Sequence, residues 1–213
     1  MKKFIFTIIT SFLLTLSSAN ADIMPYTSND IALDTLGMYQ VPFNIVIYKT
    51  PNEKSEIVYR ANWDQASFNC SEGTIDTFFT TYISDKNLGF IQVTDFTDNW
   101  AKVIYNKDKH KTGWVKAEDL RFMTWRNFMG TYARRYGIYL FNDIPEENQV
   151  LYSGIGENAQ RLQSISKNPS KIKLTAIKGN LILITAIENN SGKTGFLKWR
   201  NETGRVYAFP AIR

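Results

Sequence analysis

Cys70 and His110 are the single cysteine and the single histidine of the 213-residue chain, so they are the one pair that could act as a cysteine nucleophile and its base. That chemistry requires the thiolate to lie within hydrogen-bond reach of the imidazole. His110 falls in the lysine-rich stretch 107–111, and Cys70 precedes a Ser-Glu-Gly loop. We therefore expect a solvated histidine and an incidental thiol. With one histidine and one cysteine, a zinc site would need carboxylates for most of its ligands, so we expect neither a metal nor a cofactor.

Two pairs of carboxylates lie close together in the sequence, Asp95 with Asp98 and Glu146 with Glu147. Glycoside hydrolysis needs two carboxyl groups about 5 to 9 Å apart in a cleft. Both pairs fall in polar stretches where acidic residues are common, which favours solvated loops. The segment Gly154–Glu157 begins like a phosphate-binding loop but has no third glycine and no Lys-Ser or Lys-Thr pair. It is interpreted as a turn that enters a helix, and the chain is predicted not to be an enzyme.

The first 21 residues have the three parts of a bacterial-type signal peptide. Lys2 and Lys3 precede an apolar run from Phe4 to Leu16, and Ala19 and Ala21 form an A-x-A cleavage site. We predict cleavage after Ala21, with an uncleaved anchor as the alternative. No later stretch approaches the ~20 apolar residues of a membrane-spanning helix. The mature protein, from residue 22, is therefore expected to be periplasmic or secreted, with no membrane span.

Charge and cysteine content narrow the function classes further. The net charge of +5 falls to +3 when Lys2 and Lys3 are removed, and no run of Lys and Arg is present. Nucleic acid is therefore not an expected partner. A single cysteine allows no intramolecular disulfide, although exported proteins often contain them. Stability must come from packing of the 192 mature residues.

Short runs rich in Ile, Val, Tyr, Phe and Thr, separated by polar turns, predict an all-β protein. In the first half the expected strands are Phe43–Tyr48, Ile57–Tyr59, Phe78–Ile83, Phe90–Val93, Trp100–Tyr105 and Gly113–Val115. In the second half they are Ile138–Phe141, Ile172–Ala176, Leu181–Ile187, Gly195–Trp199 and Arg205–Phe209. Two segments are expected to be helical, Glu118–Arg135 and Glu157–Ser166.

A pattern of residues occurs once in each half. Residues 99–104 (Asn-Trp-Ala-Lys-Val-Ile) lead through a polar loop to 111–116 (Lys-Thr-Gly-Trp-Val-Lys), while 180–184 (Asn-Leu-Ile-Leu-Ile) lead to 193–198 (Lys-Thr-Gly-Phe-Leu-Lys). The asparagine precedes the glycine by 14 residues in the first and 15 in the second. Chance similarity between hairpins is the alternative, but the pattern favours two copies of one β unit. We predict domains at 22–125 and 126–213, joined by a short helical or irregular connector.

The first copy resembles a bacterial SH3-like (SH3b) domain, a small five-stranded barrel. The resemblance covers part of the first half: the opening strand at 45–51, the Trp-x-Lys-Val strand at 100–103 and the Gly-Trp-Val strand at 113–115. The second half matches more faintly. The resemblance implies two tandem small SH3-like β-barrels in an envelope protein, and a cell-wall peptide or an envelope protein as the partner.

Alternation along a strand sorts the residues of the 100–105 strand by face. Val103 is expected in the core with Ala101 and Tyr105, which places Trp100 beside Lys102 on the less buried face. An exposed tryptophan can stack on a sugar or a peptide. The candidate ligand-binding residues are Trp100, Lys102, Trp114 and Tyr48.

Packing remains the alternative for Trp100 and is the default role of the other four tryptophans, Trp63, Trp114, Trp125 and Trp199. The predicted function is a non-catalytic binding module. Two alternatives are a small cell-wall hydrolase that uses Cys70 or a carboxylate pair, and a structural subunit of an envelope complex.

Overall fold

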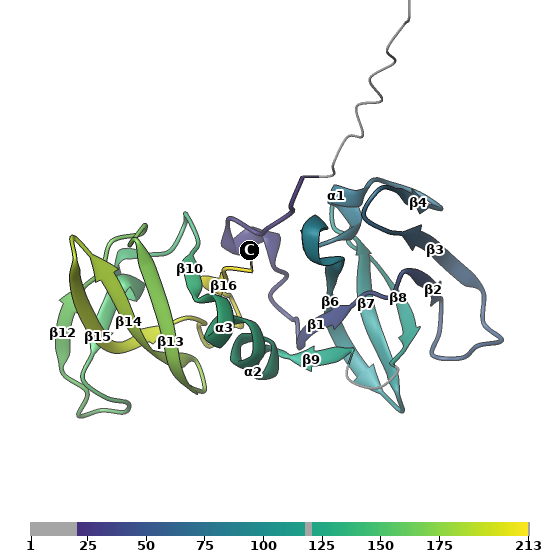
Figure 1. The fold of residues 1–213 in the computed structure, drawn as a ribbon. Helices are drawn as coiled ribbons and strands as arrows, with labels where there is room; N and C mark the ends of the chain where they lie inside the picture. The colour runs from purple at the N-terminus through teal and green to yellow at the C-terminus, as the bar shows by residue number, and fades with distance from the viewer. Residues whose placement is uncertain (1–20, 118–120, 213) are drawn as a thin grey trace, which may run out of the picture.

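The protein contains two antiparallel β-sheets with a short helical segment between them, as the computed structural model shows (Figure 1). The structure describes residues 21–117 and 121–212. The predicted all-β class is confirmed. The expected signal peptide lies outside the described residues except for Ala21. In the described ranges, no helix is long and apolar enough to cross a membrane.

The first sheet has nine strands, of which eight follow the order β4-β3-β2-β8-β7-β6-β1-β9, while β5 lies off this path and pairs with β6. Their bounds are β1 Gly37–Gln40, β2 Asn44–Tyr48, β3 Ile57–Trp63, β4 Phe68–Cys70, β5 Thr81–Ile83, β6 Leu88–Thr97, β7 Trp100–Asn106, β8 Lys111–Lys116 and β9 Phe122–Thr124. The same half contains the 3-10 turns η1 (Ser28–Asp30) and η2 (Ser84–Lys86) and the one-turn helix α1 (Ile75–Phe78).

The second sheet has seven strands in the order β12-β11-β15-β14-β13-β10-β16. Their bounds are β10 Ile138–Leu140, β11 Val150–Tyr152, β12 Arg161–Ser164, β13 Lys171–Lys178, β14 Leu181–Glu188, β15 Ser191–Lys198 and β16 Ala208–Pro210. The helices of this half are α2 (Trp125–Phe128), the π-helical turn η3 (Met129–Ala133), α3 (Arg134–Tyr136) and the 3-10 turn η4 (Glu146–Gln149).

The two sheets have the same topology. If β4 and β5 are left out, strands β3-β2-β8-β7-β6-β1-β9 of the first sheet correspond in order to β12-β11-β15-β14-β13-β10-β16 of the second, and the chain visits them in the same sequence. The local pairings agree as well, because Val103 lies opposite Gly113 in the first sheet and Ile184 lies opposite Gly195 in the second. The repeated sequence pattern therefore marks equivalent hairpins.

A matching irregularity strengthens this correspondence. In the first sheet the register shifts between Val93 and Asp95. In the second sheet it shifts between Leu174 and Ala176. The two positions are equivalent, because Val93 and Leu174 each pair with the residue that lies opposite the glycine of the hairpin. β-Bulges re-aim side chains and increase local twist. Both units thus have a register shift at the same position, next to equivalent hairpins.

Two hydrophobic cores stabilise the molecule. The first lies against the first sheet and includes Ile47, Tyr59 and Val103, all fully or almost fully buried. The second includes the helical segment and the second sheet, and it extends to the first sheet where Phe90 packs edge-on against Phe128 at 5.2 Å. Because this core crosses the expected boundary at residue 125, the two units are packed together, and separate domains stay a prediction.

The segment 22–35 joins the two halves (Figure 1). Ile23 forms a bridge with Tyr82 of the first sheet. A few residues later, the amide and hydroxyl groups of Ser28 donate to the carboxylate of Asp143, at 2.8 and 2.6 Å. The same segment therefore contacts both halves of the chain, which sequence patterns within either half do not reveal.

One expectation about secondary structure was wrong, and two were right only in part, since β5 lies within the predicted strand Phe78–Ile83 and residues 125–135 of the predicted helix Glu118–Arg135 are helical. The predicted helix Glu157–Ser166 contains strand β12, whose residues are all exposed and whose order comes from pairing with β11. The predicted strand Phe78–Ile83 begins instead with the end of α1, because the Thr77 hydroxyl accepts from the amide of Thr74 and closes a helical turn. In the predicted helix Glu118–Arg135, residues 118–120 are not described, and β9 precedes a helix that starts only at Trp125.

Candidate functional site

The four predicted binding residues lie together on the outer face of the first sheet. On β7, Ala101 and Val103 are buried and point into the core, so Trp100 and Lys102 point outward and are half-buried. Trp114 on β8 lies opposite Lys102 on one side and opposite Tyr48 of β2 on the other. Three strands therefore position one surface, which we call the aromatic face: Tyr48, Trp100, Lys102 and Trp114.

The side chains of the aromatic face contact one another. The Tyr48 and Trp100 rings meet edge to face, with centroids 5.6 Å apart and an angle of 88° between the planes. The Lys102 ammonium nitrogen lies 6.0 Å from the centroid of the Trp114 ring, which is at the limit of a cation–π contact. A half-exposed surface of three rings and an ammonium group can bind a ligand with apolar and acidic parts.

A hollow of about 320 Å³ adjoins the aromatic face and shares Tyr48 with it. Its rim includes the ion pair between Lys116 of β8 and Glu53, and the hydrogen bond from Lys116 lowers the pKa of Glu53. Because both side chains are exposed, the pair adds little to stability, but it places a charge of each sign beside the rings. Tyr39 also lines the hollow.

Sequence reasoning missed Lys116, Glu53 and Tyr39. Lys116 could have been found, because it lies two residues beyond Trp114 on the same strand and alternation places both on one face. Glu53 and Tyr39 reach the hollow from a loop and from another strand, so only the folded chain places them there.

Gly113 explains how β2 approaches β8 at the aromatic face. A Cβ atom at this position would lie 3.0 Å from the backbone oxygen of Tyr48 and 2.5 Å from a methyl carbon of Ile47. Both distances are shorter than ordinary van der Waals contacts, so a side chain here would push the strands apart. The glycine of the repeated Lys-Thr-Gly pattern therefore permits the Tyr48–Trp114 pairing.

The same place in the second unit has different side chains. Tyr152 lies opposite Phe196, as Tyr48 lies opposite Trp114. Leu181 lies opposite Lys198, as Trp100 lies opposite Lys116. The second unit thus keeps the tyrosine and lysine, and leucine replaces the outward-facing tryptophan.

Cys70 ends strand β4 and His110 lies in the turn before β8, and none of the described contacts joins their side chains. The ion pair between Lys111 and Glu72, 2.8 Å long, joins the segments that follow these two residues. The Cys70 thiol donates to the carbonyl oxygen of Glu72 at 3.3 Å. A hollow of about 420 Å³ has Cys70 but not His110 in its lining. His110 instead occupies a turn position with a φ of 50°.

Of the first carboxylate pair, Asp98 lies in a turn as expected, whereas Asp95 lies within strand β6. Asp95 accepts a hydrogen bond from the amide of Phe96, and Asp98 lies in the β6–β7 turn with a φ of 42°. Glu146 and Glu147 begin η4. None of these four residues lines the hollows at Tyr48, Cys70 or Tyr139. Within residues 21–117 and 121–212, no group of three or more His, Cys, Asp and Glu side chains could hold a metal ion.

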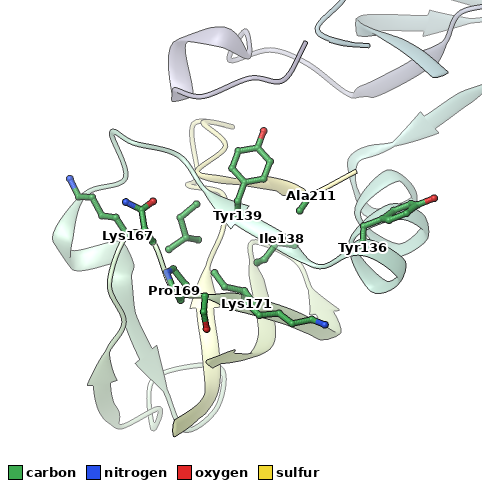
Figure 2. A pocket seen from close by; sticks show the side chains of 11 residues that line it. Tyr136, Ile138, Tyr139, Lys167, Pro169, Lys171 and Ala211 are labelled. Atoms are coloured by element: carbon green, nitrogen blue, oxygen red, sulfur yellow. The ribbon is translucent and has the colours of Figure 1, made fainter. Parts of the chain in front are cut away.

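A further hollow of about 440 Å³ lies where β10 and β13 diverge, since these strands pair only at Ile138 and Ile172 (Figure 2). Lys167 and Lys171 extend to different sides of this hollow in Figure 2, and Tyr139 points away toward the N-terminal segment, where its hydroxyl donates to the carbonyl oxygen of Pro25. The two ammonium groups do not converge on one point, so the aromatic face is the better defined candidate site.

Comparisons with known proteins place the chain in no established group. No family model, no curated protein sequence and no solved structure matches it. The fold and the site consequently define the class: an all-β protein with two sheets of equivalent topology, of which the first presents an aromatic face.

Proposed function

We propose that this protein is an exported, non-catalytic binding protein of the cell envelope, and that its first unit binds a cell-wall peptide or a partner protein through the aromatic face. The observation that carries the proposal is the convergence of Tyr48, Trp100, Lys102 and Trp114 from three strands onto one outer surface. Interaction sites are enriched in aromatic residues that combine a large apolar area with a polar group.

The proposal includes SH3-like units and periplasmic or secreted localisation. The repeated strand order supports two copies of one small β unit. The matching motif residues of the resemblance lie on β2 and the loop that follows it, on β7 and on β8, and these three strands form the aromatic face. Asp22, the first residue of the expected mature chain, accepts hydrogen bonds from the amide and hydroxyl groups of Ser84 at 2.9 and 3.0 Å. Cleavage after Ala21 would leave these contacts intact.

Substitution of Trp100 by alanine tests the site. Because Trp100 lies on the outer face and is half-buried, its replacement opens no core cavity and should cost less than ~1 kcal/mol of stability. Loss of a central aromatic anchor should cost ~2 kcal/mol or more of binding free energy, which is about thirtyfold in Kd. Cosedimentation with purified peptidoglycan, and pull-down from envelope extract, measure the binding.

Two variants serve as controls. Trp100→Phe keeps an aromatic ring and should retain most of the binding. Val103→Ala removes methyl groups from a residue with 0% exposure, so it should lose roughly 1 to 3 kcal/mol of stability while leaving the outer surface in place. If Trp100→Ala binds as well as the wild type, or loses as much stability as Val103→Ala, the proposed site is wrong.

A further inference from the structure

The position in the second unit that corresponds to the aromatic face is a hollow of about 400 Å³. Tyr152, Leu181 and Lys198 line it, and by the strand pairings these residues correspond to Tyr48, Trp100 and Lys116. The lysine is ion-paired in both units, although the acidic partner differs in place: Lys116 contacts Glu53 in the loop after β2, and Lys198 contacts Glu202, which follows β15, at 3.0 Å.

The hollow lies where the second unit has a smaller side chain than the indole of the first unit. Leucine at position 181 replaces the indole of Trp100, and Gly154, Gly156 and Ala159 are also among the residues that line the hollow. A Cβ atom added at either glycine would meet nothing within 4 Å. Among the described residues, no aromatic ring packs against Tyr152, whereas Trp100 packs against Tyr48.

We propose that this hollow is a second binding site, which receives an aromatic side chain of a polypeptide ligand in the place that Trp100 fills in the first unit. The first unit is the template for this choice, since it shows an indole resting edge to face on the equivalent tyrosine. Such ring pairs are favoured beyond their burial of apolar area. Lys178 and Lys198 also line the hollow, and a lysine ammonium group can contact the face of an aromatic ring.

The rim can hold the polar part of such a ligand. Asn180 lines the hollow and donates through its side-chain nitrogen to the carbonyl oxygen of Asn201 at 3.4 Å, which leaves its side-chain oxygen as an acceptor. The Glu202 carboxylate is a second acceptor. An indole N–H or a backbone amide of the ligand could donate to either. This site does not depend on what the first unit binds.

Titration of the full mature chain with N-acetyltryptophanamide tests the proposal, with backbone amide NMR shifts at residues 152, 181 and 198 as the readout. The probe should bind at these residues and should bind more tightly than N-acetylleucinamide, which has no ring. Leu181→Trp fills the hollow and should weaken binding at least about tenfold. Trp100→Leu opens the equivalent place beside Tyr48 and should create an additional site there.

Equal binding of the two probes, or unchanged binding to a folded Leu181→Trp variant, would overturn the proposal. If Leu181→Trp does not fold, Tyr152→Leu replaces it, because removal of the half-buried tyrosine ring should weaken probe binding to the same extent. None of these measurements involves peptidoglycan or substitution of Trp100 by alanine. A negative result in these experiments therefore does not contradict the proposed function of the first unit, and a negative result for the first unit does not contradict the site in the second.

Discussion

Gly195→Ala tests the close approach of β11 to β15, which corresponds to the approach of β2 to β8 in the first unit. A Cβ atom at this position would lie 2.9 Å from the Cβ of Leu151 and 3.0 Å from the backbone oxygen of Tyr152. Leu151 has 0% exposure, so neither neighbour can move without displacing β11. Overpacking of this kind costs about 1 to 3 kcal/mol, and we expect that loss in the free energy of unfolding.

Gly192→Ala is the matched control on the same strand. Its Cβ atom would lie 3.6 Å from the nearest methyl carbon, that of Thr185, which is an ordinary contact. Replacement of a strand glycine by alanine at an unstrained position should be neutral or stabilise by up to ~1 kcal/mol, because the unfolded chain loses conformational freedom. Urea denaturation followed by far-UV circular dichroism and tryptophan fluorescence compares the two variants.

Gly113→Ala extends the test to the first unit. Here the added Cβ would lie 2.5 Å from a methyl carbon of Ile47, which is fully buried, and 3.0 Å from one of Val58. The stability loss should therefore be at least as large as that of Gly195→Ala. The close approach of these strands is refuted if the free energies of unfolding of both variants lie within about 0.5 kcal/mol of that of Gly192→Ala. In that case β2 does not approach β8, nor β11 approach β15, as closely as described, and the equivalence of the two units fails.

Two further predictions concern contacts that sequence patterns do not show. Asp143→Ala leaves the amide and hydroxyl donors of the buried Ser28 without their acceptor. The free energy of unfolding should therefore fall by about 1 to 3 kcal/mol, and amide hydrogen exchange should become faster in the segment 22–35. Unchanged exchange there would refute the role of this contact. Glu188 has a lowered pKa, chiefly through its contact with Lys193 at 2.7 Å. Its contribution to stability is therefore present above the unfolded-state pKa of about 4.3, and it is lost as the pH falls through the folded-state pKa. Glu188→Gln should therefore destabilise the protein at pH 7 more than at pH 3, and an equal effect at both pH values in urea denaturation would contradict this.

Local sequence patterns were sufficient for the hairpin that carries the site. Alternation placed Val103 in the core and Trp100 and Lys102 on the other face, because successive side chains of a strand point to opposite sides whatever the partner strand is. The spacing of asparagine and glycine identified the equivalent hairpins for a similar reason, since each pattern lies within one hairpin closed by its own turn.

Patterns failed where a segment has no apolar face of its own. The segment Glu157–Ser166 was expected to be helical, yet the exposed residues of β12 are ordered by backbone pairing with β11, and such pairing leaves no periodicity in the side chains. β1, β4, β9 and β11 were also missed. Short strands of three or four residues are too brief for an alternation to be distinguished from chance.

The strand-rich composition, the faces of β7 and the two similar hairpins could all be predicted from local patterns, because these features depend on residues that are neighbours along the chain. The pairing of Tyr48 with Trp114, more than sixty residues later, and of Glu53 with Lys116 could be seen only in the folded chain. The folded chain also shows that the segment after residue 22 contacts both halves of the molecule and that Leu181 borders a hollow. These features depend on which strands meet and on how completely side chains fill the space between them, and both are settled only when distant parts of the chain pack together.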